Sequence, residues 1–434
     1  MPAISPEDEV ARICSELIRF DTSNYGGNEG PGERAAAEYT AGLLEEAGLQ
    51  AEIFESAPGR ASLVARMTGE DPSAGALVVH GHLDVVPAQK EDWQVDPFSG
   101  EERDGLIWGR GAVDMKDMDA MILAVARDMA RTGVRPKRDL VFAFFADEEA
   151  GGKYGARWAV DNRPELFDGA TEAISEVGGF SATIGGKRAY MLQTAEKGIA
   201  WLRLAVMGRA GHGSQLNTDN AVTTLAQAVS RIGAHQWPIE LTDTTRRFLD
   251  GVTELTGVEF DPDNPDILLK ELGTVARFVG ATLQNTSNPT VLKAGYKENV
   301  IPGLAEARID ARTLPGQDEL VLAKIRELAG EGVDISYVHQ DRALEVPFSG
   351  SLVDAMVDSL TAEDPDAVVL PYTLSGGTDN KSLARLGITG YGFAPLRLPD
   401  ELDFTGMFHG VDERVPVESL KFGTRVLGRL LRSY

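Results

Sequence analysis

Cysteine is almost absent from this sequence, and long apolar runs and an excess of basic residues are missing too. The 434 residues include one cysteine, Cys14, so no disulfide can form within the chain, as expected in a reducing compartment. The longest apolar runs, such as LVFAFFA at 140–146, are far shorter than the roughly 20 residues of a membrane-spanning helix. The first residues, MPAISPEDEVARIC, lack the basic and apolar regions of a signal peptide. We therefore expect a cytoplasmic protein with no membrane partner.

Acidic residues greatly outnumber basic ones. Asp and Glu total 67 while Lys and Arg total 42, which gives a formal net charge of −25 at pH 7. Phosphate backbones and anionic lipid surfaces would repel such a chain, so we expect no nucleic-acid partner. Hydrophobic residues make up 43% of the chain, enough for a sizeable core, and the length suggests two or three domains.

Apolar segments and helical patterns alternate in the first half, which indicates an α/β fold. Helices are predicted at 33–47 and about 115–131, where apolar and helix-forming residues recur at helical spacing. The apolar runs at 62–66, 76–80 and 140–146 do not alternate with polar residues. Such runs are typical of strands buried on both faces of a largely parallel sheet.

The middle of the chain predicts a second, smaller domain with the order β-α-β-β-α-β, that of the split ferredoxin-like arrangement. Its predicted strands lie at 199–207, 290–294, 304–312 and 333–338, and its helices at 220–234 and 317–329. Residues 240–285, which contain the turn sequence DPDNPD, look like an insertion inside this unit. After about residue 346 the α/β pattern resumes. We therefore expect a larger domain at 1–194 and 343–434, interrupted by an inserted domain at 195–342.

Histidine and carboxylate residues gather where the predicted strands end. His82 follows the strand at 76–80, Glu148 and Glu149 follow the strand at 140–146, and Glu176 ends a short apolar run. Asp114 stands at the start of a helix. Ligands of open α/β sheets bind outside the carboxyl ends of the strands, and carboxylates that converge there repel unless a cation neutralises them. Imidazole and carboxylate ligands suit zinc, with cobalt or manganese as substitutes.

Each of these residues alone has an ordinary explanation. A lone His82 is more often a core or surface histidine, Asp114 could be a helix N-cap, and Asp-Glu-Glu is usually a solvated loop. Their joint placement at strand ends, beside glycines, favours a metal site instead. Asp84 stands two residues after His82, close enough to orient the imidazole.

The motifs GHLDVVP, GRGAVDMK, DEEAGG, SEVGG and FHGVDERVP, in this order, resemble those of the aminoacylase/glutamate-carboxypeptidase family of co-catalytic zinc hydrolases. The resemblance runs from about residue 10 to the C-terminus. It implies a zinc-peptidase catalytic domain interrupted by a lid and dimerisation domain, and two Zn²⁺ ions per chain. By this resemblance Asp114 bridges both metals, Glu148 is the general base and Asp84 is the partner of His82. The remaining metal ligands it implies are His82 and Glu176 on one side and Glu149 and His409 on the other.

The same resemblance implies a cis peptide bond between Asp114 and Met115. The sequence departs from the family at two positions. Asp117 stands where a glycine is common, and Val177 separates Glu176 from the glycine pair that follows it. Neither position is an implied metal ligand, so we expect these differences to affect local shape and specificity but not metal binding.

His212, in GRAGHGS, would by itself be a histidine in a flexible glycine-rich turn. The resemblance implies instead that it reaches the active site of a neighbouring subunit and stabilises the oxyanion. Relatives bind the substrate carboxylate with an Asn and an Arg, which match Asn299 and Arg312; alone, Arg312 would be a surface arginine. Gly376, Gly377 and Thr378 would add backbone and hydroxyl donors, although the glycine pair could also be a simple turn. His80 is expected beside the site, and His235 and His339 at helix-end or loop surface.

We therefore expect a metal-dependent amidohydrolase or metallopeptidase that cleaves an amide bond next to a free carboxylate. Its small-molecule substrate would be an N-acyl amino acid or a peptide, and the enzyme would be a homodimer formed through the inserted domain. An N-acyl-amino-acid deacylase, a dipeptidase and a carboxypeptidase all fit, and an acetylornithine or succinyl-diaminopimelate type of deacylase is the alternative. A relative that binds metal without turnover would have lost Glu148 or a ligand, and every one of these residues is retained.

Overall fold

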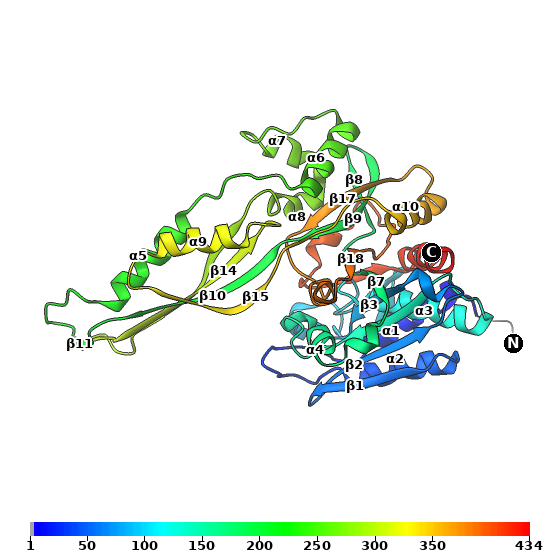
Figure 1. Ribbon diagram of the computed structural model, residues 1–434, viewed down its shortest axis with the longest axis horizontal. Coiled ribbons are helices and arrows are strands. Elements are labelled where there is room, and N and C mark those ends of the chain that lie inside the picture. Colours follow the sequence, from blue (N-terminus) through cyan, green and yellow to red (C-terminus); the bar gives the residue numbers. More distant parts are fainter. Residues whose placement is uncertain (1–3) are drawn as a thin grey trace.

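The computed structural model describes residues 4–434, which form a large α/β body and an elongated second body (Figure 1). The large body is built on a ten-stranded mixed sheet with the order β1-β2-β6-β3-β7-β18-β9-β16, in which β17 and β8 also pair with β9. The central neighbours β6, β3, β7 and β18 are parallel. Its strands are β1 (Ala51–Ala57), β2 (Arg60–Met67), β3 (Ala76–His82), β6 (Asp139–Phe145), β7 (Ala170–Ser175), β8 (Phe180–Ile184), β9 (Lys187–Glu196), β16 (Leu344–Glu345), β17 (Val368–Leu374) and β18 (Thr389–Gly392).

The central strands β3 and β6 are buried on both faces along nearly their whole length, as their apolar sequences predict. In β6, Leu140, Phe142 and Phe144 join the main hydrophobic core. Val141 and Phe145 point the other way, into a second core. Helices therefore cover both faces of the sheet, and both cores are closed from water.

The main core lies under α1 (Pro6–Ile18), α2 (Arg34–Glu46), α3 (Lys116–Thr132), α10 (Ser351–Glu363) and α12 (Val417–Ser433). The opposite face is covered by α4 (Ala156–Asn162) and α11 (Asn380–Leu383). A small three-stranded sheet of β4 (Glu101–Arg103), β5 (Leu106–Trp108) and β19 (Arg414–Pro416) joins the C-terminal region to the loop before Asp114. None of the helices among the described residues combines the length and apolar character needed to cross a membrane.

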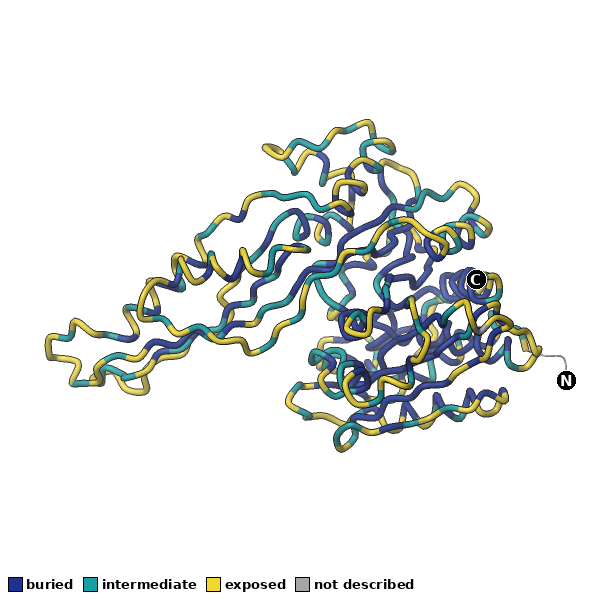
Figure 2. The backbone as a smooth tube through the Cα atoms, in the orientation of Figure 1, coloured by how far each residue is buried: buried dark blue, intermediate teal, exposed yellow. Residues whose placement is uncertain are grey.

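The second body is the ferredoxin-like unit that the sequence predicts, and it is called the inserted domain below. Its antiparallel sheet has the order β12-β14-β10-β15, and one face is packed against α5 and α9 over a separate hydrophobic core. Its elements are β10 (Gly198–Met207), α5 (Ala221–Ala234), β12 (Thr286–Ala294), β14 (Leu304–Thr313), α9 (Asp318–Ala329) and β15 (Asp334–Asp341). At its far end β11 (Gly211–His212) pairs with β13 (Val300–Ile301). Figure 2 shows that this end is mostly exposed.

The stretch expected as an insertion, 240–285, folds back onto the large body. It forms α6 (Asp243–Thr256), α7 (Asp266–Leu269) and α8 (Ala276–Gly280). Phe248, Leu249 and Val252 on α6 belong to the main core of the large body, not to the core of the inserted domain. We propose that the inserted domain is bounded near the β9–β10 and β15–β16 connections, and that α6 to α8 belong to the large body.

Candidate metal centre

Three neighbouring parallel strands end at one place and deliver the site. β3 ends with His82, the loop after β6 carries Glu148 and Glu149, and Glu176 directly follows β7. Asp114 comes from the loop before α3. The carboxyl ends of parallel strands share one edge of the sheet, so side chains far apart in sequence meet there.

Two groups of side chains at this edge share Asp114. His82, Asp114 and Glu176 form one group, and Asp114, Glu149 and His409 form the other. In each group one potential ligand atom per residue lies within 4.8 Å of the others. Both groups offer only imidazole nitrogen and carboxylate oxygen, a ligand set that suits zinc and similar divalent metals.

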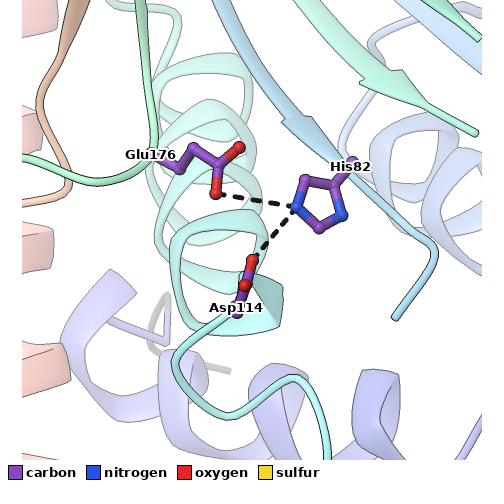
Figure 3. A group of neighbouring side chains, drawn as sticks. All are labelled: His82, Asp114 and Glu176. Carbon is purple, nitrogen blue, oxygen red and sulfur yellow. Dashed lines mark hydrogen bonds and ion pairs between the residues drawn. The ribbon is translucent and has the colours of Figure 1, made fainter. Parts of the chain in front are cut away.

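The first group is centred on the His82 ring. Its Nε2 lies 3.2 Å from Oδ1 of Asp114 and 3.6 Å from Oε2 of Glu176, and both carboxylates point toward this nitrogen (Figure 3). Its Nδ1 donates to the backbone carbonyl of Asp84 at 2.9 Å. This donation fixes the ring orientation and leaves Nε2 facing the carboxylates, as a metal ligand requires.

The second group brings the C-terminal part of the chain to the site. Nε2 of His409 lies 3.3 Å from Oδ2 of Asp114 and 3.1 Å from Oε2 of Glu149. His409 adopts a left-handed backbone conformation with φ of 56°, which turns its side chain toward the sheet edge. Hydrogen bonds to these two carboxylates raise the pKa of His409 to about 10.

Electrostatics at this edge favour a bound cation. Burial raises the pKa of Glu176 to about 7 and the pKa of Glu148 well above its usual range, and in Glu148 the charge of Glu176 adds to the effect. Burial also raises the pKa of Glu149, and the charge of Asp114 adds to it. Carboxylates with such raised pKa values are stabilised as anions by positive charge, so the residues fit a pair of divalent metals.

Asp84 supports the site through its backbone and its side chain. Besides the carbonyl that accepts from His82, its carboxylate accepts the backbone N–H groups of Glu148 at 3.0 Å and Glu149 at 3.1 Å. Asn24 donates to the same carboxylate at 2.9 Å. Asp84 therefore holds both the imidazole and the loop of the two glutamates, and its carboxylate lies 3.7 Å from Nδ1 of His82.

A cavity of about 420 Å³ opens beside the two groups, between the large body and the inserted domain. Arg312 of β14 lines it, and its Nε and Nη2 donate to the carboxylate of Asp310 at 2.7 Å and 3.1 Å. Gly376 and Gly377 also line it. Apolar residues cover another part of the wall, namely Val177, Ile199, Phe278, Leu374 and Phe408.

Thr378 lines the cavity, but its hydroxyl already donates a hydrogen bond to Glu196. Oγ1 donates to Oε1 of Glu196 at 2.6 Å and the backbone N–H donates to Oε2 of the same residue at 3.0 Å. Gly377 packs closely against Lys381, because a Cβ there would lie 2.6 Å from its Nζ and would require that side chain to shift. Thr378 therefore anchors the glycine loop in this structure.

His212 and Asn299 lie elsewhere. Both are at the far end of the inserted domain, away from the large sheet (Figure 1). The backbone N–H of Gly213 donates to the carbonyl of Asn299 at 2.9 Å, and both His212 and Asn299 are exposed. The structure thus separates the expected site residues into the group at the sheet edge and a pair at this tip.

The backbone around Asp114 and Glu176 has the local features that the sequence predicts. The Asp114–Met115 peptide bond is cis, as the resemblance implies. Val177 adopts φ of 55°, and a Cβ on the following Gly178 would clash with the Gly392 carbonyl, so the glycine is needed one residue later than the family pattern. His80 is buried within β3, two residues before the strand ends at His82.

His339 was expected on loop surface, and that expectation is wrong. It lies on β15, its side chain is 15% exposed and it lines the cavity. The predicted strand ended at residue 338, whereas β15 continues to Asp341 and includes His339. His235 does lie at a helix end, directly after α5, as expected.

Glu413 is a further residue that the sequence analysis did not single out. Its buried carboxylate accepts backbone N–H groups from Gly111, Val113 and Asp114, and Nη1 of Arg110 donates to it at 2.8 Å. The acidic residue in FHGVDERVP, four residues after His409, was the available signal. Glu413 fixes the loop that carries Asp114, the residue that both groups share.

The chain is similar in sequence to known metal-dependent hydrolases. A model of peptidase family M20/M25/M40 matches residues 78–433. The N-fatty-acyl-amino acid synthase/hydrolase of Mus musculus is 32% identical over 389 residues, which cover 81% of this chain and 72% of that protein. Aminoacylase-1 of Homo sapiens is 28% identical over 439 residues, which cover 99% of this chain and 97% of that protein.

Solved structures share the fold at low sequence identity. An M20 family metallo-carboxypeptidase from Sulfolobus solfataricus has a TM-score of 0.76 at 17% identity and covers 98% of this chain and 99% of its own. A dinuclear metal binding peptidase of the M20 family from Bacillus subtilis has a TM-score of 0.61 at 15% identity and covers 98% of each chain. Both the large body and the inserted domain are therefore parts of the shared fold.

Proposed function

The chain belongs to peptidase family M20/M25/M40, and from this premise we propose that it is a two-zinc hydrolase of N-acyl amino acids. Family membership makes it a metal-dependent hydrolase, and the relatives with N-acyl-amino-acid and aminoacylase names support the substrate class. The observation that carries the proposal is the sharing of Asp114 between two groups of ligands. A bridging carboxylate between two such groups is the arrangement that a pair of metals needs.

We propose that His82, Asp114 and Glu176 hold one zinc ion, and that Asp114, Glu149 and His409 hold the other. When bound, such a pair lowers the pKa of a water molecule and polarises the carbonyl of the scissile bond. Asp84 keeps the His82 ring in the orientation that presents Nε2 to the metal. Cobalt or manganese would fit the same nitrogen and oxygen ligands.

Glu148 is the proposed general base. It lines the cavity, its Oε2 lies 3.9 Å from Nε2 of His82, and burial raises its pKa well above its usual range. A carboxylate with a raised pKa can accept the proton of the attacking water at Oε and later deliver it to the leaving nitrogen. Glu149, one residue later, faces His409 instead, so the two neighbours have separate tasks.

Arg312 is the proposed anchor of the substrate carboxylate. Its guanidinium faces the cavity and is held in place by Asp310, and Nη1 has no partner among the described residues. A fixed guanidinium binds a carboxylate with directed hydrogen bonds and so orients the amide bond. The backbone of Gly376 and Gly377 supplies further donors on the same wall.

His212 and Asn299 are proposed to act on the site of a partner subunit. Both sit on the exposed tip of the inserted domain, and their own chain's metal centre lies at the large sheet (Figure 1). A two-fold axis would let each tip reach the other subunit's site, where His212 would stabilise the oxyanion. The edge strand β12, exposed from Asn288 to Ala294, offers backbone groups for pairing with a copy of itself. A cytoplasmic location is proposed from the single, buried Cys14.

A substrate panel tests the proposal. The zinc-reconstituted protein is assayed with N-acetyl and N-fatty-acyl amino acids, their amides, and dipeptides, before and after treatment with a chelator. We expect N-acyl amino acids with a free carboxylate to be hydrolysed fastest, with activity lost on chelation and restored by zinc. If dipeptides are hydrolysed faster than every N-acyl amino acid, the protein is a dipeptidase and not a deacylase. Hydrolysis that survives complete metal removal would refute the two-metal site.

A further inference from the structure

The edge strand β15 contains a bulge that changes which way its last residues face. β15 pairs with β10 so that Trp201 is opposite His339 while the next residue, Leu202, is opposite Tyr337. Val338 is therefore an extra residue on β15, and the alternation of side chains shifts by one. Ile335, before the bulge, packs on the helix-covered core. Without the bulge His339 would face that core as well, because side chains two residues apart lie on one side of a strand.

After the bulge, His339 and Asp341 instead face the cavity beside the metal centre. Nε2 of His339 lies 2.6 Å from Oδ2 of Asp341, and its ring centroid is 5.1 Å from that of Trp201. Bulges that turn a side chain toward a site recur beside active sites. The bulge therefore delivers a hydrogen-bonded pair of side chains from the inserted domain to the wall of the cavity.

The pair contacts the loop that carries Glu148. A Cβ on Gly151 would lie 3.1 Å from Cε1 of His339, so the imidazole ring sits directly on the Gly151 backbone. Gly151 has φ of +93°, a conformation that favours glycine, and it follows Glu148 by three residues. The inserted domain thus touches this loop through an imidazole ring.

Asp341 contacts α4, the helix that follows the Glu148 loop. Its Oδ1 accepts from Nη2 of Arg157, which lies on α4. The loop from Glu148 to Gly151 is therefore bounded on one side by Asp84, which accepts the N–H groups of Glu148 and Glu149, and on the other by His339. Asp84 belongs to the large body, whereas His339 and Asp341 belong to the inserted domain.

We propose that His339, fixed by Asp341, is a positioning residue for the Glu148 loop. Through this pair the orientation of the inserted domain sets where the carboxylate of Glu148 stands relative to the substrate. The inference rests on the proposed role of Glu148 as the base. His339 acts through the loop and not on the reacting atoms, so its loss should lower kcat more than it changes KM.

Two substitutions at His339 distinguish the effect of its hydrogen bond to Asp341 from the effect of its side-chain volume. His339→Gln keeps an N–H donor near the position of Nε2, whereas His339→Leu keeps volume but cannot donate to Asp341. Ser336→Ala, at an exposed position of the same strand, is the matched control. Each variant is assayed for kcat and KM on the best N-acyl amino acid of the panel, and its zinc content and thermal midpoint are measured.

We expect His339→Leu to lower kcat at least about tenfold with KM within about twofold, and His339→Gln to recover most of the loss. Ser336→Ala should match the wild type. In the metal-free protein, hydrogen exchange of the amides from Gly151 to Arg157 should be faster in His339→Leu than in wild type. Either wild-type kcat in His339→Leu or unchanged exchange of this segment would overturn the proposal. A loss in His339→Gln as large as in His339→Leu would also overturn it.

These outcomes are distinct from a failure of the proposed function. If the wild-type protein hydrolyses none of the panel, deacylation is refuted, and the exchange measurement alone decides whether His339 holds the loop. If the wild type is active and His339→Leu is unimpaired, only the positioning role is refuted.

Discussion

The carboxylate of Glu413 accepts a hydrogen bond from the backbone N–H of Asp114 at 3.0 Å, although 298 residues separate the two in sequence. The same carboxylate also accepts from Val113 at 2.7 Å and Gly111 at 3.0 Å and is paired with Arg110. One buried side chain near the C-terminus thus determines the path of the loop that presents Asp114. The placement of Asp114, which both candidate ligand groups share, therefore depends on docking of the C-terminal segment.

Replacing Glu413 should damage both stability and the metal centre. Glu413→Ala leaves three N–H groups and a buried guanidinium without their acceptor, so we expect unfolding free energy to fall by about 3–5 kcal/mol. The measurement is urea denaturation of the metal-free protein, followed by zinc titration. Glu418→Gln, on the exposed side of α12, is the control and should change little. Wild-type stability and zinc binding in Glu413→Ala would contradict the role assigned to this carboxylate.

The two ligand groups predict close to two equivalents of zinc per chain. His409→Ala removes a ligand from one group only, so metal analysis after reconstitution should find about one equivalent. His235→Ala, at the end of α5, is the control and should retain two. A wild-type protein that binds no more than one equivalent, with His409→Ala unchanged, would leave the chain with a single metal site.

Glu148 and its neighbour should behave differently when changed to glutamine. Glu148→Gln keeps size and hydrogen bonding but cannot accept a proton, so kcat should drop by about 10²–10⁴-fold with zinc content unchanged. Glu149→Gln removes a proposed ligand atom and should lower zinc content as well. The measurements are steady-state kinetics and metal analysis on both variants. A Glu148→Gln enzyme with a tenth of wild-type activity would exclude Glu148 as the base.

Arg312 should set the preference for a free carboxylate. Arg312→Met should raise KM for N-acyl amino acids at least about tenfold and remove most of their advantage over the matching amides, because the charge that distinguishes them is gone. Arg308→Met, on the same face of β14, is the control. KM is compared for each acid and its amide. An equal loss on acid and amide would mean that Arg312 supports the fold only.

The exposed tip predicts that the active site is completed across a dimer. His212→Ala should be nearly inactive with both metals bound, and so should Glu148→Gln. When the two are mixed under conditions that exchange subunits, each heterodimer has one site with both defects and one with neither. Activity should then return toward half of the wild-type value per heterodimer. If subunits exchange and no activity returns, His212 acts on its own chain or has no catalytic role.

The parts of the fold that follow from local pattern could be predicted from the sequence. The strands that end at His82 and before Glu148 each contain an apolar run, and residues that follow such a run stand near the sheet edge. The β-α-β-β-α-β order also predicted the ferredoxin-like sheet of the inserted domain. Neither prediction needed knowledge of distant contacts.

Features that depend on distant contacts could not be predicted. The direction of His339 depends on a bulge at Val338, which is defined by pairing with β10 and leaves no mark in the sequence of β15 itself. The packing of α6 against the main core also could not be predicted from the sequence of α6, because its apolar face would fit either core. The position of His212 beside Asn299 comes from the pairing of β11 with β13, segments far apart in the chain.

The return of α6, α7 and α8 to the large body also limits how the inserted domain can be exchanged between proteins. The chain passes between the two bodies at the β9–β10, α5–α6, α8–β12 and β15–β16 connections, so the four-stranded sheet is made from two separate stretches of sequence. A single contiguous cassette cannot carry this sheet into a related enzyme without also carrying Phe278 and the cavity wall it forms. Grafting the tip with His212 onto another scaffold as one contiguous segment therefore transfers part of the cavity wall with it.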